Sequence, residues 1–341
     1  MPGMSYALSV LDQSPIPAGG TLADAVANTL DLARLCDRLG YVRYWLAEHH
    51  ASPALAGVAP EALIGPVALA TRDIRVGSGG IMLPHYSPYK VAETFALLDA
   101  LAPGRIDLGV GRAPGSDGRT AFALQRDRSR TMPHDFPDQL DELAAHLAGT
   151  LPADHPFAPL HATLPTGSGT GPELWMLGSS PDSARWAAER GMPYCFADFI
   201  NDGGAEIAAA YRRDFRPGLR ATPHLAVAAW TIAADTRAEA ERLAAPARMM
   251  FAHLVAGRPI AVPGIAEALA WADANPSVAR RRRRTILGAP GEVRSGLDAL
   301  ADEYGADELM LVNILPEHAA RRRSYELVAR EYGLAALARA A

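Results

Sequence analysis

The chain has 341 residues, of which 49% are hydrophobic, and a formal net charge of −5. This charge argues against a nucleic-acid or anionic-membrane partner, because such binders need clustered positive charge, and it favours a small-molecule substrate. Cys36 and Cys195 are the only cysteines and no run of 18 uncharged apolar residues occurs, so we expect a cytoplasmic protein without disulfides or a membrane span.

Short apolar runs alternate with amphipathic helical patterns along the whole chain. The first half predicts strands over residues 6–11, 41–47, 74–83 and 106–110, with helices over 22–39, 60–70, 89–101 and 136–147. The second half predicts strands over residues 174–177, 193–196, 224–232 and 308–314, with helices over 182–190, 205–213, 291–304 and 317–332 and another beginning at 237. Eight strands that are each followed by a helix predict an α/β fold, the (β/α)8 TIM barrel, since right-handed parallel crossovers repeated eight times close most easily.

Two segments interrupt this rhythm, and we expect residues 1–341 to form one domain that carries both. Residues 150–172, after the fourth helix, are rich in Pro, Gly, Thr and His and predict a surface excursion. Residues 257–285, after the seventh strand, lack a helical or strand period, as is typical of a lid over the top of a barrel. The arginine run at 280–284 within them indicates a solvated face or a helix end, with an anion-attracting rim as the alternative.

The second strand ends in a glutamate followed by His49 and His50. Adjacent side chains of a strand point to opposite faces, so at most one of the two histidines points into a pocket and the other is structural. The spacing does not match HExxH and no partner cluster completes a site, so we expect no metal. A general base or charge stabiliser and a buried, hydrogen-bonded structural histidine are the two interpretations.

Glycines at the ends of the third and fourth strands offer backbone that a flat ligand can approach. Ser78, Gly79 and Gly80 interrupt an apolar strand, which indicates either a β-bulge or a backbone that a planar ring touches. The stretch GVGRAPG at 109–115 is a weak match to a dinucleotide fingerprint, because it meets a proline and a polar stretch where a Rossmann turn opens into a helix. We expect these glycines to approach a ligand, with Arg112 as a charged donor at the strand end.

Gly178, Ser179 and Ser180 lie between the fifth strand and a helix that begins at a proline. Hydroxyls and free backbone N–H groups at a helix N-terminus form a ready phosphate site, and Pro181 gives up an N–H that had no intrahelical partner. Ordinary capping of the helix is the alternative explanation.

Five segments in order, WLAEHH, RVGSGGIMLP, GRIDLGVGRAPG, LWMLGSSPDSARWAAERGMP and TILGAPGEV, resemble the bacterial luciferase-like flavin monooxygenase family, in particular its single-chain members outside the true luciferases. The resemblance spans essentially the whole chain. It implies a TIM barrel that binds reduced FMN, captures O2 as a C4a-peroxyflavin and inserts one oxygen atom into a small organic substrate. It also implies a homodimer and a separate NAD(P)H:flavin reductase that supplies FMNH2.

The resemblance assigns roles to individual residues. His49 matches the active-site histidine and Arg112 matches an arginine near the flavin, so we expect both to act in catalysis and Arg112 to contact the cofactor as well. Gly79 and Gly80 match a non-prolyl cis peptide beneath the flavin ring. The positions around the flavin phosphate are matched by Ser179, Ser180 and Ser183.

The chain also departs from the luciferase pattern. Gly111 stands where luciferase α chains have a reactive cysteine, and Ser179 replaces an acidic residue before the phosphate serine. Light emission and long-chain aldehyde specificity therefore do not carry over, and the unlike sequence of the lid leaves the substrate open. The alternatives are an F420-dependent hydride-transfer enzyme on the same barrel, and a non-catalytic flavin-binding barrel, against which the strand-end His49 and Arg112 argue.

Overall fold

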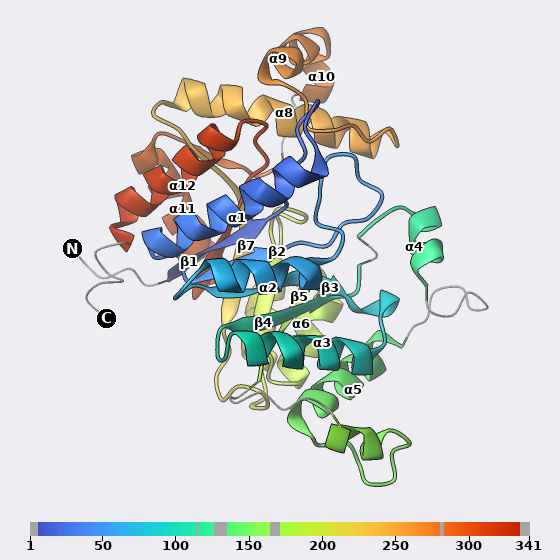
Figure 1. Cartoon of the computed structure of the whole chain (residues 1–341). Coiled ribbons are helices and arrows are strands. Elements are labelled where there is room, and N and C mark those ends of the chain that lie inside the picture. Colours follow the sequence, from blue (N-terminus) through green and yellow to red (C-terminus); the bar gives the residue numbers. More distant parts are fainter. Residues whose placement is uncertain (1–5, 114, 126–134, 164–170, 280–282, 335–341) are drawn as a thin grey trace.

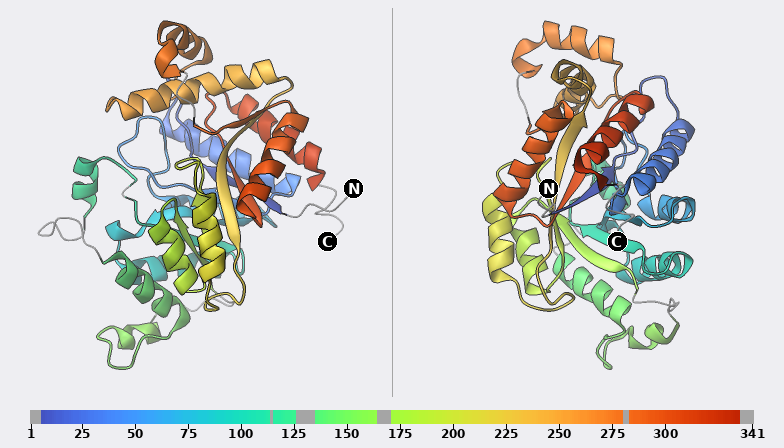
Figure 2. Two further views of the ribbon diagram at one scale, coloured as in Figure 1. Left: turned by 180° about the vertical axis from the view of Figure 1, so that it is seen from behind. Right: turned by 90° about the vertical axis from the view of Figure 1, so that its left-hand side faces the viewer.

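The computed structural model describes residues 6–113, 115–125, 135–163, 171–279 and 283–334. Within them, eight parallel strands form a closed barrel in the order β1–β2–β3–β4–β5–β6–β7–β9, and β9 pairs with β1 (Figures 1 and 2). The strands are β1 (Ala7–Asp12), β2 (Arg43–Leu46), β3 (Arg75–Met82), β4 (Ile106–Gly111), β5 (Glu173–Gly178), β6 (Tyr194–Ala197), β7 (Leu225–Ala233) and β9 (Glu308–Val312). The predicted (β/α)8 TIM barrel is confirmed.

Helices follow the strands and cover the outside of the barrel (Figure 2). Their ends follow local rules: the first begins with a capping box, in which Asp24 N donates to Thr21 Oγ1 and Thr21 N donates back to Asp24, and ends at Gly40 in the left-handed region. These covering helices are α1 (Leu22–Leu39), α2 (Pro60–Ala70), α3 (Pro88–Leu101), α5 (Phe136–Ala148), α6 (Pro181–Glu189), α7 (Ala205–Asp214), α8 (Arg237–Val255), α11 (Pro290–Tyr304) and α12 (His318–Tyr332).

The expectation that residues 257–285 lack regular structure is wrong. They contain α9 (Ile265–Ala274) and α10 (Pro276–Ala279), which lie against α8 on its outer side (Figure 1). The α9 sequence is rich in alanine and its apolar period is therefore weak, but Ala268 is buried in a cluster with Met249 of α8. Tertiary packing therefore stabilises a helix that the sequence pattern did not indicate.

Four further short elements were not expected. They are the 3₁₀ turn η1 (Leu83–His85) directly after β3, α4 (Gly118–Leu124), the 3₁₀ turn η2 (Ala158–Thr163) within the excursion at 150–172, and β8 (Ile286–Gly288), which pairs in parallel with the end of β7. A three-residue strand is too short to show a period, so only its pairing reveals it. Residues 164–170 of the excursion and 280–282 of the arginine run lie outside the described residues.

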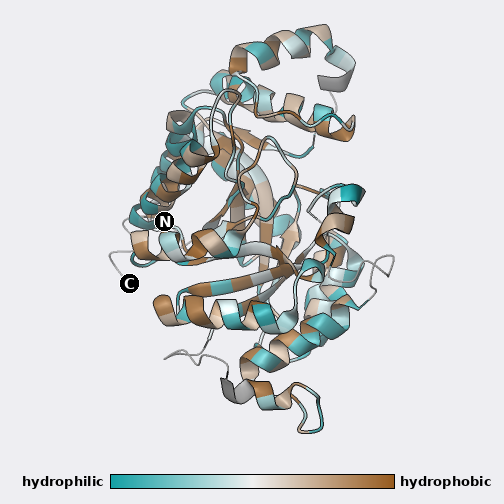
Figure 3. Ribbon diagram, turned by 45° about the vertical axis from the view of Figure 1, so that its right-hand side comes forward, coloured by the Kyte–Doolittle hydropathy of each residue, from teal (hydrophilic) through white to brown (hydrophobic). Residues whose placement is uncertain are grey.

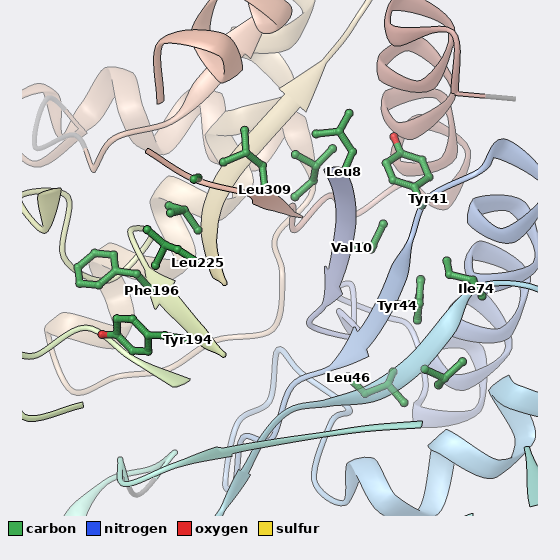
Figure 4. Close-up of a cluster of buried hydrophobic side chains, with 14 of the residues drawn as sticks. Leu8, Val10, Tyr41, Tyr44, Leu46, Ile74, Tyr194, Phe196, Leu225 and Leu309 are labelled. Atoms are coloured by element: carbon green, nitrogen blue, oxygen red, sulfur yellow. The ribbon is translucent and has the colours of Figure 1, made fainter. Parts of the chain in front are cut away.

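Strand alternation divides the core into two layers. Leu8 and Val10 of β1 and Tyr44 and Leu46 of β2 point outward and pack beneath the helices (Figure 4). The residues between them point into the barrel, where Leu11 joins a second cluster with other inward-facing side chains. Both faces are buried, so the strands read as nearly continuous apolar runs and are coloured largely as hydrophobic in Figure 3.

The amino ends of the strands are closed by an ionic cluster inside the barrel. Arg43 donates to Asp107 at 2.8 Å, to Glu173 at 3.0 Å and to Glu308 at 3.1 Å, and its guanidinium lies over the Trp175 ring. Burial raises the pKa of Glu308, but the Arg43 cation and the hydrogen bonds from His224 and Ser9 together outweigh it and hold that pKa at about 2. The side chains of this cluster thus fill the amino end of the barrel interior. No helix in the described part of the chain is long and apolar enough to cross a membrane.

Candidate active site

A cavity of about 260 Å³ lies at the carboxyl ends of the strands, where TIM-barrel enzymes place their chemistry. Its walls come from the ends of β1, β2, β6, β7 and β9, from α8 and from the segment 257–285. The lining residues are Gln13, His49, Ser52, Ala54, Leu55, Phe199, Ile200, Trp230, Met250, Phe251, Leu254, Pro259, Ile260, Arg283 and Ile314. The segment expected to act as a lid therefore supplies part of the cavity wall.

His49 borders this cavity. Its backbone N–H donates to Gly57 O at 2.6 Å, and its buried Nδ1 has no hydrogen-bond partner among the described residues. Burial, with a smaller contribution from the neighbouring His50, lowers the pKa of His49 to about 4. The imidazole is therefore neutral at neutral pH and keeps an uncommitted ring nitrogen.

His50 has a different environment. Its Nε2 lies 2.7 Å from Glu48 Oε1, and it is absent from the residues that line the cavity. Glu48 is itself fixed, because it accepts hydrogen bonds from the Met82 N–H at 3.0 Å and from the Tyr86 hydroxyl at 3.1 Å. The structure thus places one histidine at the cavity and ties the other to a buried carboxylate. Both lie in the loop after β2 and not at the end of the strand as expected, so strand alternation does not explain the difference.

The glycines of β3 and β4 allow the two strands to approach closely. The peptide bond between Gly79 and Gly80 is cis, as the resemblance implies, and the pairing with β4 shifts register after Gly79. A Cβ on Gly80 would lie 2.7 Å from Gly109 O, so a side chain does not fit there. The Ser78 hydroxyl is buried and donates to Gly109 O at 2.8 Å, which turns it toward β4. The cavity lining includes none of these residues.

The serines after β5 cap α6. Ser183 N donates to Ser180 Oγ at 3.3 Å, and the Ser183 hydroxyl donates to Ser180 O at 2.8 Å and shares a hydrogen bond with the Tyr194 hydroxyl. Gly178 is needed because a Cβ there would lie 2.5 Å from Ser183 Cβ. Ser179 contributes its carbonyl, which accepts from Asn201 Nδ2 at 3.1 Å. Ser180 and Ser183 therefore act as capping residues of α6 in this structure.

Arg112 lies beside the same helix. Its guanidinium covers the Trp186 ring at 5.1 Å and lies 3.3 Å from Asp182, both residues of α6. Its side chain is half exposed and is not part of the cavity lining, so the residues selected from the sequence form two groups. His49 belongs to the cavity, whereas Arg112 joins the N-terminal turn of α6.

This second group has the chemistry of a phosphate site. A helix N-terminus carries partial positive charge and unpaired N–H groups, and Arg112 adds a cation beside it. The close approach allowed by Gly178 brings the first turn of α6 against the end of β5. Asp182 is the opposing feature, since its carboxylate now pairs with Arg112. The described residues contain no group of three or more His, Cys, Asp or Glu suited to a metal ion.

Sequence reasoning missed most of the cavity wall. Trp230 and Phe199 follow no recognisable motif, and Phe251 of α8 lies in an ordinary amphipathic helix. Besides His49, Arg283 had a signal, because the arginine run suggested an anion-attracting rim as an alternative.

The chain is 42% identical to the uncharacterized protein YwcH of Bacillus subtilis (strain 168), over 94% of this chain and 97% of that protein. It is 38% identical to the N-acetyl-S-alkylcysteine monooxygenase of the same organism, over 94% and 96% of the two chains. The crystal structure of apo-MsnO8 is similar with a TM-score of 0.87 at 38% identity, covering 96% of this chain and 99% of that one.

More distant structures share the fold alone. They include an oxygenating constituent of 3,6-diketocamphane monooxygenase from Pseudomonas putida in complex with FMN, with a TM-score of 0.69 at 19% identity. They also include a coenzyme F420-dependent tetrahydromethanopterin reductase from Methanopyrus kandleri, with a TM-score of 0.64 at 15% identity. The sequence model of luciferase-like monooxygenases matches residues 4–321, and the chain therefore belongs to the luciferase-like monooxygenase family.

Proposed function

We propose that this protein is a flavin-dependent monooxygenase that uses reduced FMN and O2 to insert one oxygen atom into a small organic substrate. The observation that carries the proposal is the neutral imidazole of His49 beside a largely apolar cavity at the carboxyl end of a barrel of this family. The apolar walls of such a cavity disfavour water beside the substrate, and a neutral imidazole can accept or relay a proton there.

The residues at the α6 N-terminus suit the cofactor phosphate. The N–H groups of the first turn of α6 and the hydroxyls of Ser179 and Ser180 would hold the phosphate, with Arg112 balancing its charge. The backbone at Gly79 and Gly80, which carries no side chain, would border the ring. When bound in its reduced form, the flavin supplies the reaction with O2.

In this proposal, His49 and the residues of the cavity wall act on the substrate. His49 holds or moves a proton at its ring nitrogen, and the aromatic side chains of Phe199, Trp230 and Phe251 orient the substrate and keep water out. Arg112 is assigned to the cofactor phosphate and no longer to catalysis, because it lies beside α6 and outside the cavity lining.

FMN is favoured over F420 by the relatives. A protein that is 38% identical over nearly the whole chain is named a monooxygenase, whereas the F420-dependent barrel shares only the fold. Reduced FMN must be supplied, so the proposal includes a separate NAD(P)H:flavin reductase as partner. We also propose that the protein is a cytoplasmic homodimer and that each of its chains forms one domain.

A cofactor titration tests this function. The purified protein is titrated without oxygen with FMNH2 and, separately, with reduced F420, and O2 is then admitted while the absorption spectrum is recorded. We expect tight binding of FMNH2, and reoxidation through a transient spectrum distinct from those of reduced and oxidised FMN. His49→Gln should retain FMNH2 binding and alter the lifetime of the transient. Tight binding of reduced F420 together with failure to bind FMNH2 would replace monooxygenation by hydride transfer.

A further inference from the structure

We propose that Arg283 binds a carboxylate group on the substrate, so that the enzyme acts on small apolar molecules that end in a carboxylate. This inference rests on the proposed function, because it takes the cavity as the substrate site. The polar residues that line the cavity besides Arg283 are Gln13, Ser52 and His49. Because the pKa of His49 is about 4, Arg283 carries the positive charge of this lining at neutral pH.

The guanidinium of Arg283 is held in place but is not neutralised. It lies over the Phe251 ring with 4.9 Å from Cζ to the ring centroid, and Nη1 lies 3.5 Å from Phe199 O. Within the described part of the chain, no carboxylate forms an ion pair with it. A stacked guanidinium keeps the N–H groups on its edge free in the plane of the group, and two of them match the spacing of two carboxylate oxygens.

The neighbouring Arg284, in contrast, is paired with carboxylates. Arg284 donates to Glu303 at 2.8 Å and to the Asp202 carbonyl at 2.7 Å, and it lies 3.4 Å from Asp198. These contacts fasten the end of the segment 257–285 to the loop after β6 and to α11. Arg284 therefore anchors the chain, and this anchoring keeps Arg283 at the cavity.

The cavity limits the rest of the substrate. A volume of about 260 Å³ is just below the range of about 300–1,000 Å³ usual for ligand pockets, so the substrate is small. Trp230, Phe199 and Met250 offer apolar contact to its body. A neutral apolar molecule would fill the same space without pairing the Arg283 charge, whereas a carboxylate pairs it at the exposed rim of the cavity.

Binding of a matched pair of probes tests the assignment. Calorimetry on the full chain, with and without added FMN, compares hexanoate with its neutral analogue hexanamide in the wild type and in Arg283→Gln, Arg283→Lys and Arg258→Gln. We expect the wild type to bind hexanoate about two- to fivefold more tightly than hexanamide, as is typical of an ion pair at an exposed rim. Arg283→Gln should remove this preference and keep the hexanamide affinity, which also shows that the variant is folded.

The two other variants serve as controls. Arg283→Lys should retain part of the preference, because it keeps the charge and loses the two-point geometry. Arg258→Gln, in the same segment and outside the lining, should behave as the wild type. A preference that survives in Arg283→Gln, or no preference in the wild type, overturns the inference. A selective loss of FMN over riboflavin binding in Arg283→Gln also overturns it, by assigning Arg283 to the cofactor phosphate.

The same measurements separate this inference from the proposed function. Probe binding needs neither reduced flavin nor O2, so a hexanoate preference that depends on Arg283 would stand even if FMNH2 failed to bind. Conversely, a protein that reacts with FMNH2 and O2 but binds both probes equally would keep its proposed function and lose the assignment of Arg283.

Discussion

The half-buried side chain of His49, whose Nδ1 is fully buried, leads to a quantitative prediction about pH. Its pKa is lowered from 6.5 to about 4 in the folded protein, so the unfolded chain binds the proton more strongly between these two values. The free energy of unfolding therefore falls as the pH drops through this window. From the two pKa values, His49 lowers it by about 2 kcal/mol at pH 5 relative to pH 8, and by about 3 kcal/mol below pH 4.

The comparison of wild type with His49→Gln isolates this contribution, because the other histidines titrate in both proteins. The difference in melting temperature between pH 8 and pH 5 should be larger in the wild type by about 3 °C, given the unfolding entropy expected for a chain of this size. NMR of histidine labelled at Cε1, with the His49 signal identified by its loss in the variant, measures the pKa directly.

Two outcomes would refute the lowered pKa of His49. A His49 signal that titrates near pH 6.5 in the folded protein would refute the buried, neutral imidazole and with it the proton-handling role. Equal pH dependence of the two melting temperatures would lead to the same conclusion. His50→Gln provides the contrast, because it removes a histidine paired with Glu48 outside the cavity lining.

Three further predictions concern α6 and the segment 257–285. Ser180→Asp keeps a good capping residue but places a carboxylate at the proposed phosphate site, so the dissociation constant should rise at least about tenfold for FMN and little for riboflavin; equal losses would exclude a phosphate there. Gly178→Ala should destabilise the fold by about 1–3 kcal/mol and weaken the binding of FMN, because its Cβ would overlap Ser183. Gly118→Ala, which has open space around it, should change neither the melting temperature nor the FMN affinity measured by titration. Glu303→Gln removes the 2.8 Å partner of Arg284 and should speed tryptic cleavage at Arg283 and Arg284 by about two- to fivefold, as expected for a partly exposed ion pair; unchanged cleavage would show that Arg284 does not fasten the segment.

The elements that the sequence predicted well are those with a strong local signal. Residues 22–39 carry a capping residue at one end and glycine at the other, and their helix begins and ends where expected. Helix α9 and strand β8 were missed for the opposite reason, since an alanine-rich helix and a three-residue strand have almost no period of their own. They are stabilised by contacts with α8 and β7, which a local pattern does not contain.

The candidate site was likewise predicted only in part from the sequence. The two adjacent histidines were expected to point to opposite faces of a strand, but they lie in the loop after β2, and the sequence could not tell which of His49 and His50 borders a cavity. The choice depends on the Glu48 carboxylate, which is fixed from β3 and the turn after it, and so on residues distant in the sequence. The grouping of Arg112 with α6 likewise required the fold.

The sequence by itself determined the eight βα units, the family to which the chain belongs and the residues that can carry chemistry at the strand ends. Each of these can be recognised from residues close together in the sequence, because a hydrophobic period, a helix cap or a short motif involves only neighbours along the chain. Closure of the barrel alone decided that Trp230, Phe199, Phe251 and Arg283 share one cavity with His49. That arrangement arises from the packing of segments far apart in the sequence, whose contacts become favourable only when all of them bury their apolar surface together.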